Sequence, residues 1–265
     1  MPRPEDGAVT KKEADNVNAE ILEARAATKD KRFADSESLM LKVTAANPNL
    51  VLPWVELGLA QIGLKKYPEA EDSFKLALGI DPASLKRVHS EDFYQRVDAP
   101  GTVAPSATHA SRNAMGGTAN TGEKRTPDIL GTSYASLGEI YIHEGKIEDA
   151  EAAFDTAVKS NPTDAALYRR NETIFFFQAG KPDEQLKAVN EALAIDPGRA
   201  MLYYFKGQAL VSKATIDQAT QKMTLPPGCA EAYQKYLEMD PNGPYSGDAK
   251  GVLTATGIPI KATKK

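Results

Sequence analysis

The segment GGTANTGEKR, residues 116–125, contains the glycines and the lysine from which phosphate-binding loops are built. Such a loop requires Gly-x-x-x-x-Gly-Lys-Ser/Thr between a strand and a helix, so that backbone N–H groups surround the phosphates. In this chain Glu123 follows Gly122, Lys124 comes one residue late, and no strand pattern precedes the segment. The spacing therefore does not favour a nucleotide site.

Glu139 and His143 are a second candidate, because residues four apart share one face of a helix and could hold a metal ion. A third ligand would have to come from His89 or His109, which lie in or beside a long polar segment. A solvated histidine is the simpler interpretation, so we expect no metal and no cofactor. Cys229 is the only cysteine, which excludes an internal disulfide, and with no His or Arg beside it we expect a small buried side chain instead of a reactive thiol.

The sequence contains no nucleophile that stands in a recognisable pattern with a base and an orienting group. We therefore predict no catalytic site and no enzymatic activity. The net charge of -4, without a Lys/Arg block interleaved with aromatic residues, argues against a nucleic-acid partner.

No apolar run approaches the roughly 18 residues that a membrane span needs. The first sixteen residues are also too polar for a secretory signal. We expect a soluble protein that is cytoplasmic by default, or periplasmic or secreted if a signal peptide was removed.

Five segments of sixteen residues, each ending in Asn-Pro or Asp-Pro, indicate an internal repeat. The closing residues are Pro48, Pro82, Pro162, Pro197 and Pro241. Their spacings of 34, 80, 35 and 44 residues equal 34 plus insertions of 0, 46, 1 and 10. A period of 34 residues indicates a unit of two helices, neither of which can bury its apolar stripe alone.

The best-preserved unit predicts how the two helices of a repeat pack. Gly58 on the first helix and Ala70 on the second let the backbones approach, while Trp54 and Phe74 fill the space beside that contact. Pro82 ends the second helix because its ring clashes with the preceding turn and it lacks an N–H group.

The segments WVELGLAQ and YASLGEIY, each followed by Ala-x-x-x-Phe at Ala70 and Ala150, resemble the tetratricopeptide repeat family of bacterial type. The resemblance covers most of residues 17–243. It implies an all-α, right-handed superhelical solenoid of about five helix-turn-helix repeats, and the segment SGDAKGVLTATG is expected to form a C-terminal capping helix.

The expected organisation has six parts. They are a flexible N-terminus at 1–12, two repeats at 13–84, an insertion at 85–130 that is largely loop, three repeats at 131–243 with a further insertion at about 212–226, the capping helix at 244–257 and a flexible tail at 258–265. The insertion is small and polar from about 98 to 125, so it is either a mobile loop or a lid over the concave face.

The fourth repeat fits the pattern poorly and allows two registers. Counting back from Pro197 gives Arg169, Glu172, Thr173 and Phe176 at the packing positions of the first helix. Counting forward from Pro162 gives Tyr168, Asn171, Glu172 and Phe175. We prefer the first register because Gly180 then aligns with Gly145.

The resemblance implies that the first helix of each repeat lines a concave groove through its second, fifth, ninth and twelfth positions. Family members that grip C-terminal carboxylates carry Lys and Asn at the fifth and ninth positions, which Val55 and Leu59, or Ala135 and Glu139, do not match. We predict a non-catalytic protein–protein interaction scaffold whose groove binds an amphipathic or apolar peptide or protein partner, with Arg170 fixing a carboxylate or a backbone carbonyl. The predicted contact residues are Leu52, Val55, Leu59, Glu139, Arg170, Asn171, Ile174, Phe177, Tyr204, Phe205 and Gln208.

Three alternatives remain open. The groove aromatics could pack against neighbouring helices instead of facing a partner. The chain could be a small-molecule or lipid-binding receptor whose groove is covered by residues 85–130. It could also serve an enzyme whose catalytic domain lies elsewhere.

Overall fold

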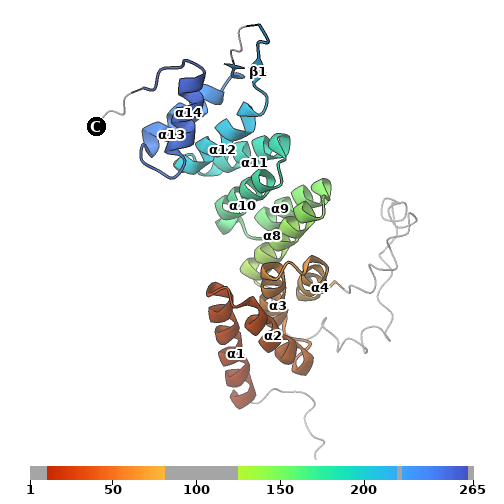
Figure 1. Cartoon of the computed structure of the whole chain (residues 1–265). Coiled ribbons are helices and arrows are strands. Elements are labelled where there is room, and N and C mark those ends of the chain that lie inside the picture. The colour runs from red at the N-terminus through yellow and green to blue at the C-terminus, as the bar shows by residue number, and fades with distance from the viewer. Residues whose placement is uncertain (1–10, 81–124, 220–222, 262–265) are drawn as a thin grey trace, which may run out of the picture. The chain divides into compact units, whose positions relative to one another are not determined.

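The computed structural model describes residues 11–80, 125–219 and 223–261, and this part of the chain is almost entirely helical. It contains eleven α-helices, one short 3₁₀ helix and a two-stranded hairpin, so the predicted all-α class is confirmed (Figure 1). The chain divides into two compact units, Met1–Ile140 and Tyr141–Lys265, which are described separately.

In the first unit, consecutive helices pack against each other from α1 to α4, and α1 also contacts α3. A further helix follows the long insertion, and its last three residues belong to the second unit. Arg125, just before that helix, donates a hydrogen bond from Nε to the carbonyl oxygen of Ala77 near the end of α4, over 2.7 Å. The helices are α1 (Lys11–Lys29), α2 (Phe33–Ala46), α3 (Val51–Gly63), α4 (Tyr67–Leu78) and α8 (Pro127–His143).

In the second unit, neighbouring helices likewise pack in sequence from α9 to α14, and α10 also contacts α12. The hairpin between α12 and α13 falls within the insertion expected at about 212–226 and pairs Thr215 with Thr224. The elements are α9 (Ile147–Ser160), η2 (Pro162–Asp164), α10 (Ala165–Gln178), α11 (Pro182–Ile195), α12 (Ala200–Val211), β1 (Thr215–Ile216), β2 (Met223–Thr224), α13 (Cys229–Met239) and α14 (Ser246–Ala255).

The turn inside each of the first four repeats contains one residue with a positive φ angle. These residues are Lys31 and Lys65 at 60°, Gly145 at 74° and Gly180 at 65°. Each of the four stands seventeen residues before the closing proline of its repeat. Gly180 therefore aligns with Gly145, and the burial of Glu172, Thr173 and Phe176 on α10 also favours the preferred register of the fourth repeat.

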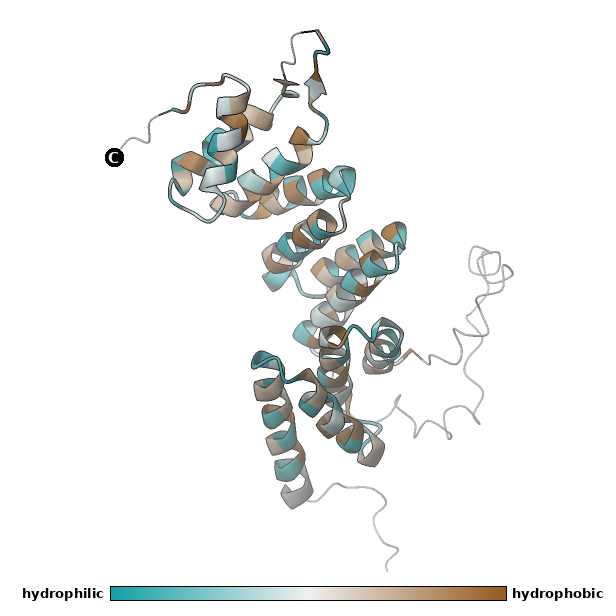
Figure 2. Cartoon of the chain, in the orientation of Figure 1, coloured by the Kyte–Doolittle hydropathy of each residue, from teal (hydrophilic) through white to brown (hydrophobic). Residues whose placement is uncertain are grey.

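Each second helix buries the same three positions of its repeat. The helices are amphipathic, with apolar and polar residues on different sides (Figure 2). The buried residues are Ser36, Met40 and Val43; Ala70, Phe74 and Ala77; Ala150, Phe154 and Ala157; Gln185, Val189 and Ala192; and Cys229, Tyr233 and Tyr236. The positions are constant, whereas the side chains that fill them are not.

Close approach of the two helices explains the glycines of the first helices. A Cβ atom added at Gly58 would lie 2.7 Å from Cε2 of Phe74, and one at Gly207 would lie 2.9 Å from the ring of Tyr233. Cys229, on the same helix as Tyr233, is fully buried, and burial raises the pKa of its thiol to about 11. This agrees with the expected buried, unreactive cysteine.

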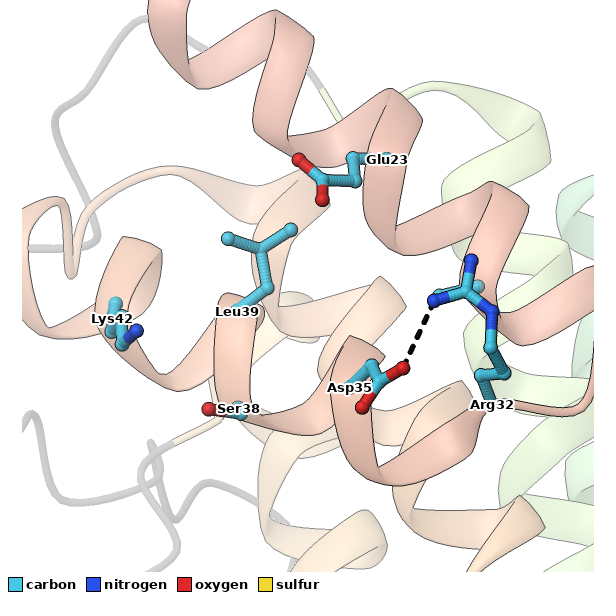
Figure 3. A pocket seen from close by; sticks show the side chains of 7 residues that line it. Glu23, Arg32, Asp35, Ser38, Leu39 and Lys42 are labelled. Atoms are coloured by element: carbon cyan, nitrogen blue, oxygen red, sulfur yellow. Dashed lines mark hydrogen bonds and ion pairs between the residues drawn. The ribbon is translucent and has the colours of Figure 1, made fainter.

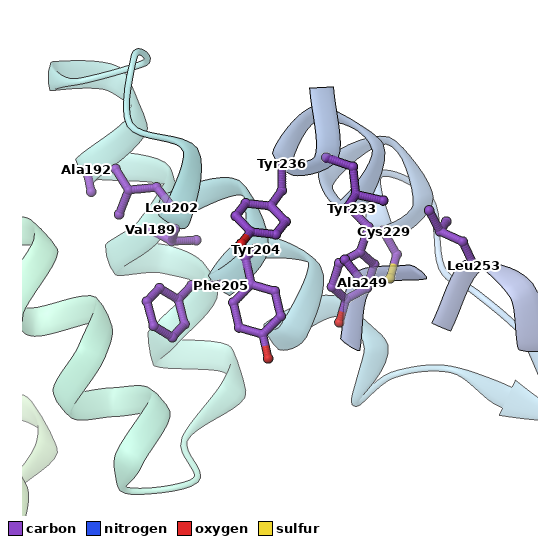
Figure 4. Packing of buried hydrophobic residues seen from close by; sticks show 11 residues of the cluster. Val189, Ala192, Leu202, Tyr204, Phe205, Cys229, Tyr233, Tyr236, Ala249 and Leu253 are labelled. Atoms are coloured by element: carbon purple, nitrogen blue, oxygen red, sulfur yellow. The ribbon is translucent and has the colours of Figure 1, made fainter. Parts of the chain in front are cut away.

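The C-terminal end is packed around aromatic rings. Figure 4 shows Tyr204 and Phe205 of α12 close to residues of α13 and α14, including Tyr236 and Ala249. Helix α14 lies where the capping helix is expected and buries Ala249 and Leu253 completely.

The described part differs from the expected boundaries at both ends of the chain. Helix α1 begins at Lys11, within the segment expected to be flexible. Residues 258–261 were also expected to be flexible, but the amide of Gln234 donates to the carbonyl oxygen of Pro259 and accepts from the N–H of Lys261. The Gln234 side chain thus satisfies two backbone groups of the C-terminal segment. This contact could not be predicted from the local sequence of that segment. Residues 1–10, 85–124 and 262–265 of the expected flexible segments, and residues 81–84 at the end of the second repeat, lie outside the described part.

Candidate partner-binding surface

The predicted contact residues stand on the first helices of the repeats. We use the name first-helix surface for the second, fifth, ninth and twelfth positions of four repeats. They are Leu52, Val55, Leu59 and Ile62 of α3; Thr132, Ala135, Glu139 and Ile142 of α8; Leu167, Arg170, Ile174 and Phe177 of α10; and Met201, Tyr204, Gln208 and Val211 of α12. Because α10 contacts α12, these helices present neighbouring faces in the second unit.

On α3 the predicted contact residues differ in burial. Leu52 is half-buried and packs against the cluster that contains Val17, Met40 and Leu57, and Leu59 is also half-buried. Val55 is only 3% exposed and is therefore a core residue. The apolar character of α3 was predicted from the sequence, but a buried side chain cannot contact a partner without rearrangement.

Glu139 on α8 is the acidic member of the first-helix surface. Its side chain is half-buried, and burial raises the pKa of its carboxyl group to about 7. The phenol of Tyr67, at the start of α4, interacts electrostatically with this carboxylate, which adds to the effect of burial in raising the pKa of Tyr67. No ion pair or hydrogen bond to Glu139 is found among the described residues.

The surface of α10 in the second unit combines a cation with apolar side chains. Leu167 is 40% exposed, while Arg170 and Asn171 are partly exposed. Ile174 and Phe177 are half-buried and pack against the C-terminal cluster, with the ring of Phe177 5.1 Å from that of Phe205. The predicted α10 residues thus reach the surface, although Asn171 lies one position beside the first-helix surface as defined.

The two neighbouring arginines of α10 have different environments. Arg169 contacts three carboxylates, those of Asp155 on α9, Glu172 at 2.8 Å and Glu191 on α11 at 3.1 Å. Burial raises the pKa of Glu172 to about 7 even though Arg169 opposes that rise. Arg170 makes no ion pair or hydrogen bond with any described residue, and its side chain is partly exposed.

Two predicted contact residues on α12 belong to the core instead. Tyr204 is 4% exposed and Phe205 2% exposed. The ring of Tyr245 stacks on Tyr204 with centroids 4.2 Å apart, and the hydroxyl of Tyr204 donates to Oδ2 of Asp248 on α14. The prediction that both aromatics face a partner is corrected on this point, because α14 and Tyr245 cover them. Gln208, further along α12, is half-buried and lies on the first-helix surface.

Comparison with known proteins agrees with this architecture. Two family models described as tetratricopeptide repeat match residues 53–84 and 136–200. These matches identify tetratricopeptide repeats in both stretches and support a protein of the tetratricopeptide repeat family. The crystal structure of MamA protein is similar, with 15% identity over 86% of this chain and 93% of that one and a TM-score of 0.51, which shows a shared fold.

A second solved structure is YrrB, described as a TPR protein with an unusual peptide-binding site. It is 16% identical over 88% of this chain and 90% of that one, with a TM-score of 0.49. The curated proteins include no match to the sequence. The tetratricopeptide fold indicates a protein-interaction scaffold.

Two hollows on the tetratricopeptide repeats are open to solvent. One lies in the first unit between α1 and α2 and is lined mainly by polar residues such as Glu23, Asp35 and Lys42 (Figure 3). The other lies between α12 and α13 and includes Tyr203 and Lys206. Neither is the enclosed apolar cavity that a lipid or small-molecule receptor requires, so the receptor hypothesis gains no support.

The residues that suggested metal or nucleotide chemistry lie only partly within the described ranges. No group of three His, Cys, Asp or Glu side chains within the described ranges could hold a metal ion. His89, His109 and residues 116–124 lie outside those ranges. No helix in the described part is long and apolar enough to cross a membrane.

Proposed function

We propose that this chain is a non-catalytic scaffold that binds a peptide or protein partner on its first-helix surface, with α10 making the main contact. The availability of Arg170 carries the proposal. Its guanidinium group is partly exposed and has no described partner, whereas that of Arg169 contacts three carboxylates.

The spacing of α10 supports a linear partner. Leu167 and Ile174 stand three residues before and four residues after Arg170, so the three side chains share one helix face. Two aliphatic side chains would take apolar residues of the partner. The planar guanidinium group of Arg170 would fix a carboxylate or backbone carbonyl beside them.

A charge reversal tests the proposal. Wild-type protein, Arg170→Glu and Lys159→Glu are immobilised and exposed to an extract of the cells that make the protein, and the retained proteins are quantified. Lys159 is the matched control, because it is exposed on α9 and makes no interaction with any described residue. We expect at least one protein to be retained by wild type and Lys159→Glu but reduced at least about tenfold by Arg170→Glu, because the new carboxylate would face the oxygen atoms that Arg170 binds.

Circular dichroism spectra of the three proteins control for folding. Retention of the same proteins at the same level by wild type and Arg170→Glu would contradict the assignment of α10 as the contact surface.

A further inference from the structure

The environment of Glu139 indicates what kind of partner the first unit accepts. The carboxyl group is half-buried on the first-helix surface and has neither a hydrogen bond nor an ion pair among the described residues. Burial alone accounts for the rise of its pKa to about 7. A desolvated carboxylate without a counter-charge is unfavourable, so a complementary group would gain more here than at an exposed acid.

Three basic side chains of the first unit are paired with other acids. Arg25 on α1 contacts Glu56 at 2.6 Å, and Lys66, beside Tyr67 in the sequence, contacts Glu37 at 2.7 Å. Lys75 on α4 is paired with Glu71. Among the described titratable groups, the phenol of Tyr67 is the one that interacts electrostatically with Glu139.

The donor set does not favour a metal ion as the missing counter-charge. A divalent cation would require several oxygen or nitrogen ligands, and no three His, Cys, Asp or Glu side chains gather in the described part of the chain. A single half-buried carboxylate matches a single ammonium or guanidinium group.

We propose that the first unit binds a partner segment carrying a lysine or arginine among apolar residues, and that this basic side chain pairs with Glu139. The inference rests on the proposed function, because it names the partner chemistry at the same first-helix surface. The apolar residues of the segment would contact half-buried side chains such as Leu59. The basic residue would fix the position of the partner segment along the first-helix surface.

Peptide selection followed by a double-mutant cycle tests the pairing. A displayed library of random 12-residue peptides is selected on the full wild-type chain, and recovered peptides are synthesised with each Lys or Arg present or replaced by norleucine. Dissociation constants are measured on wild type, Glu139→Gln, Arg170→Glu and Glu69→Gln. Glu69 on α4 is the matched control, because it is an exposed acid of the same unit.

We expect one class of peptides to carry a Lys or Arg between apolar residues and to bind Glu139→Gln at least about tenfold more weakly than wild type. Replacing the basic residue with norleucine should weaken binding to wild type by a similar factor and cause no further loss on Glu139→Gln, as for a directly interacting pair. Glu69→Gln should bind like wild type, and unchanged circular dichroism and thermal melting should show that Glu139→Gln is folded.

The outcomes separate the two proposals. If the peptides depend on Arg170 but none loses affinity on Glu139→Gln, the inference about Glu139 is overturned and the proposed function stands. If no recovered peptide depends on either residue, both proposals fail.

Discussion

The helix pairs α3–α4 and α10–α11 use the same positions for packing but fill them with side chains of different sizes. In α3–α4 the first helix has Gly58 and the second has the large ring of Phe74, which lies directly against that glycine. The corresponding positions of α10–α11 hold Thr173 and Val189, and both are fully buried. A larger residue on one helix is thus combined with a smaller one on the other, as close packing requires.

The two pairs also differ in polarity. Trp54 and Leu57 of α3 correspond to Arg169 and Glu172 of α10, and Ala70 of α4 corresponds to Gln185 of α11. The polar residues are accommodated because their partners are present. Arg169 pairs with Glu172 and two further carboxylates, and Gln185 donates a hydrogen bond to the carbonyl oxygen of Phe205 over 2.8 Å. The repeat therefore specifies burial at each position and tolerates polar side chains whose hydrogen bonds are satisfied.

The largest expected effect comes from removing the cation of the polar pair. Arg169→Leu should destabilise the protein by about 3–5 kcal/mol, because Glu172 would remain buried without its counter-charge. The double substitution Arg169→Leu plus Glu172→Leu would make these two positions of α10 apolar, as they are in α3. It should recover most of the lost stability. Denaturant unfolding followed by circular dichroism measures both.

Arg170→Leu is the matched control and should change the free energy of unfolding by less than about 0.5 kcal/mol, because Arg170 makes no ion pair or hydrogen bond with a described residue. An equal loss for Arg169→Leu and Arg170→Leu would mean that the ion network does not distinguish the two helix pairs.

A smaller effect is expected from filling the close contact of the apolar pair. Gly58→Ala would place a methyl group against the buried ring of Phe74 and should cost about 1–2 kcal/mol after the better helix propensity of alanine is included. The fluorescence of Trp54, the only tryptophan, reports unfolding on the same helix.

Thr173→Ala at the matching position of α10 removes atoms instead of adding them and also loses the hydrogen bond from the Thr173 hydroxyl to the carbonyl oxygen of Arg169. The substitution should lower the free energy of unfolding by about 1 kcal/mol.

If Gly58→Ala instead stabilised the protein, the contact with Phe74 would not be the reason for a small residue at position 58.

The sequence predicted features that depend on local spacing. Counting from the closing prolines predicted the register of the repeats, including the alignment of Gly180 with Gly145. In this register each second helix buries three residues at the same positions, and the turns of the first four repeats have a positive φ angle at the same position. These features recur because every repeat solves the same packing problem with its neighbour.

Features that depend on several helices could not be predicted in this way. Tyr204 stands at a groove position by spacing, but its burial depends on Tyr245 and on Asp248 of α14, more than 40 residues later. The roles of Arg169 and Arg170 differ because carboxylates from α9 and α11 approach only one of them. The desolvation of Glu139 likewise follows from its surroundings and not from its repeat position.

The two units therefore offer surfaces with opposite isolated charges, Glu139 in the first and Arg170 in the second. The central claim is that partners contact such first-helix side chains and not the second helices. Site-specific photo-crosslinking tests it most directly, with benzoylphenylalanine placed at Leu167 beside Arg170 or at the exposed Lys159 of α9. The account predicts a partner crosslink from position 167 and none from position 159, whereas a retained partner that crosslinks only from position 159 would contradict it.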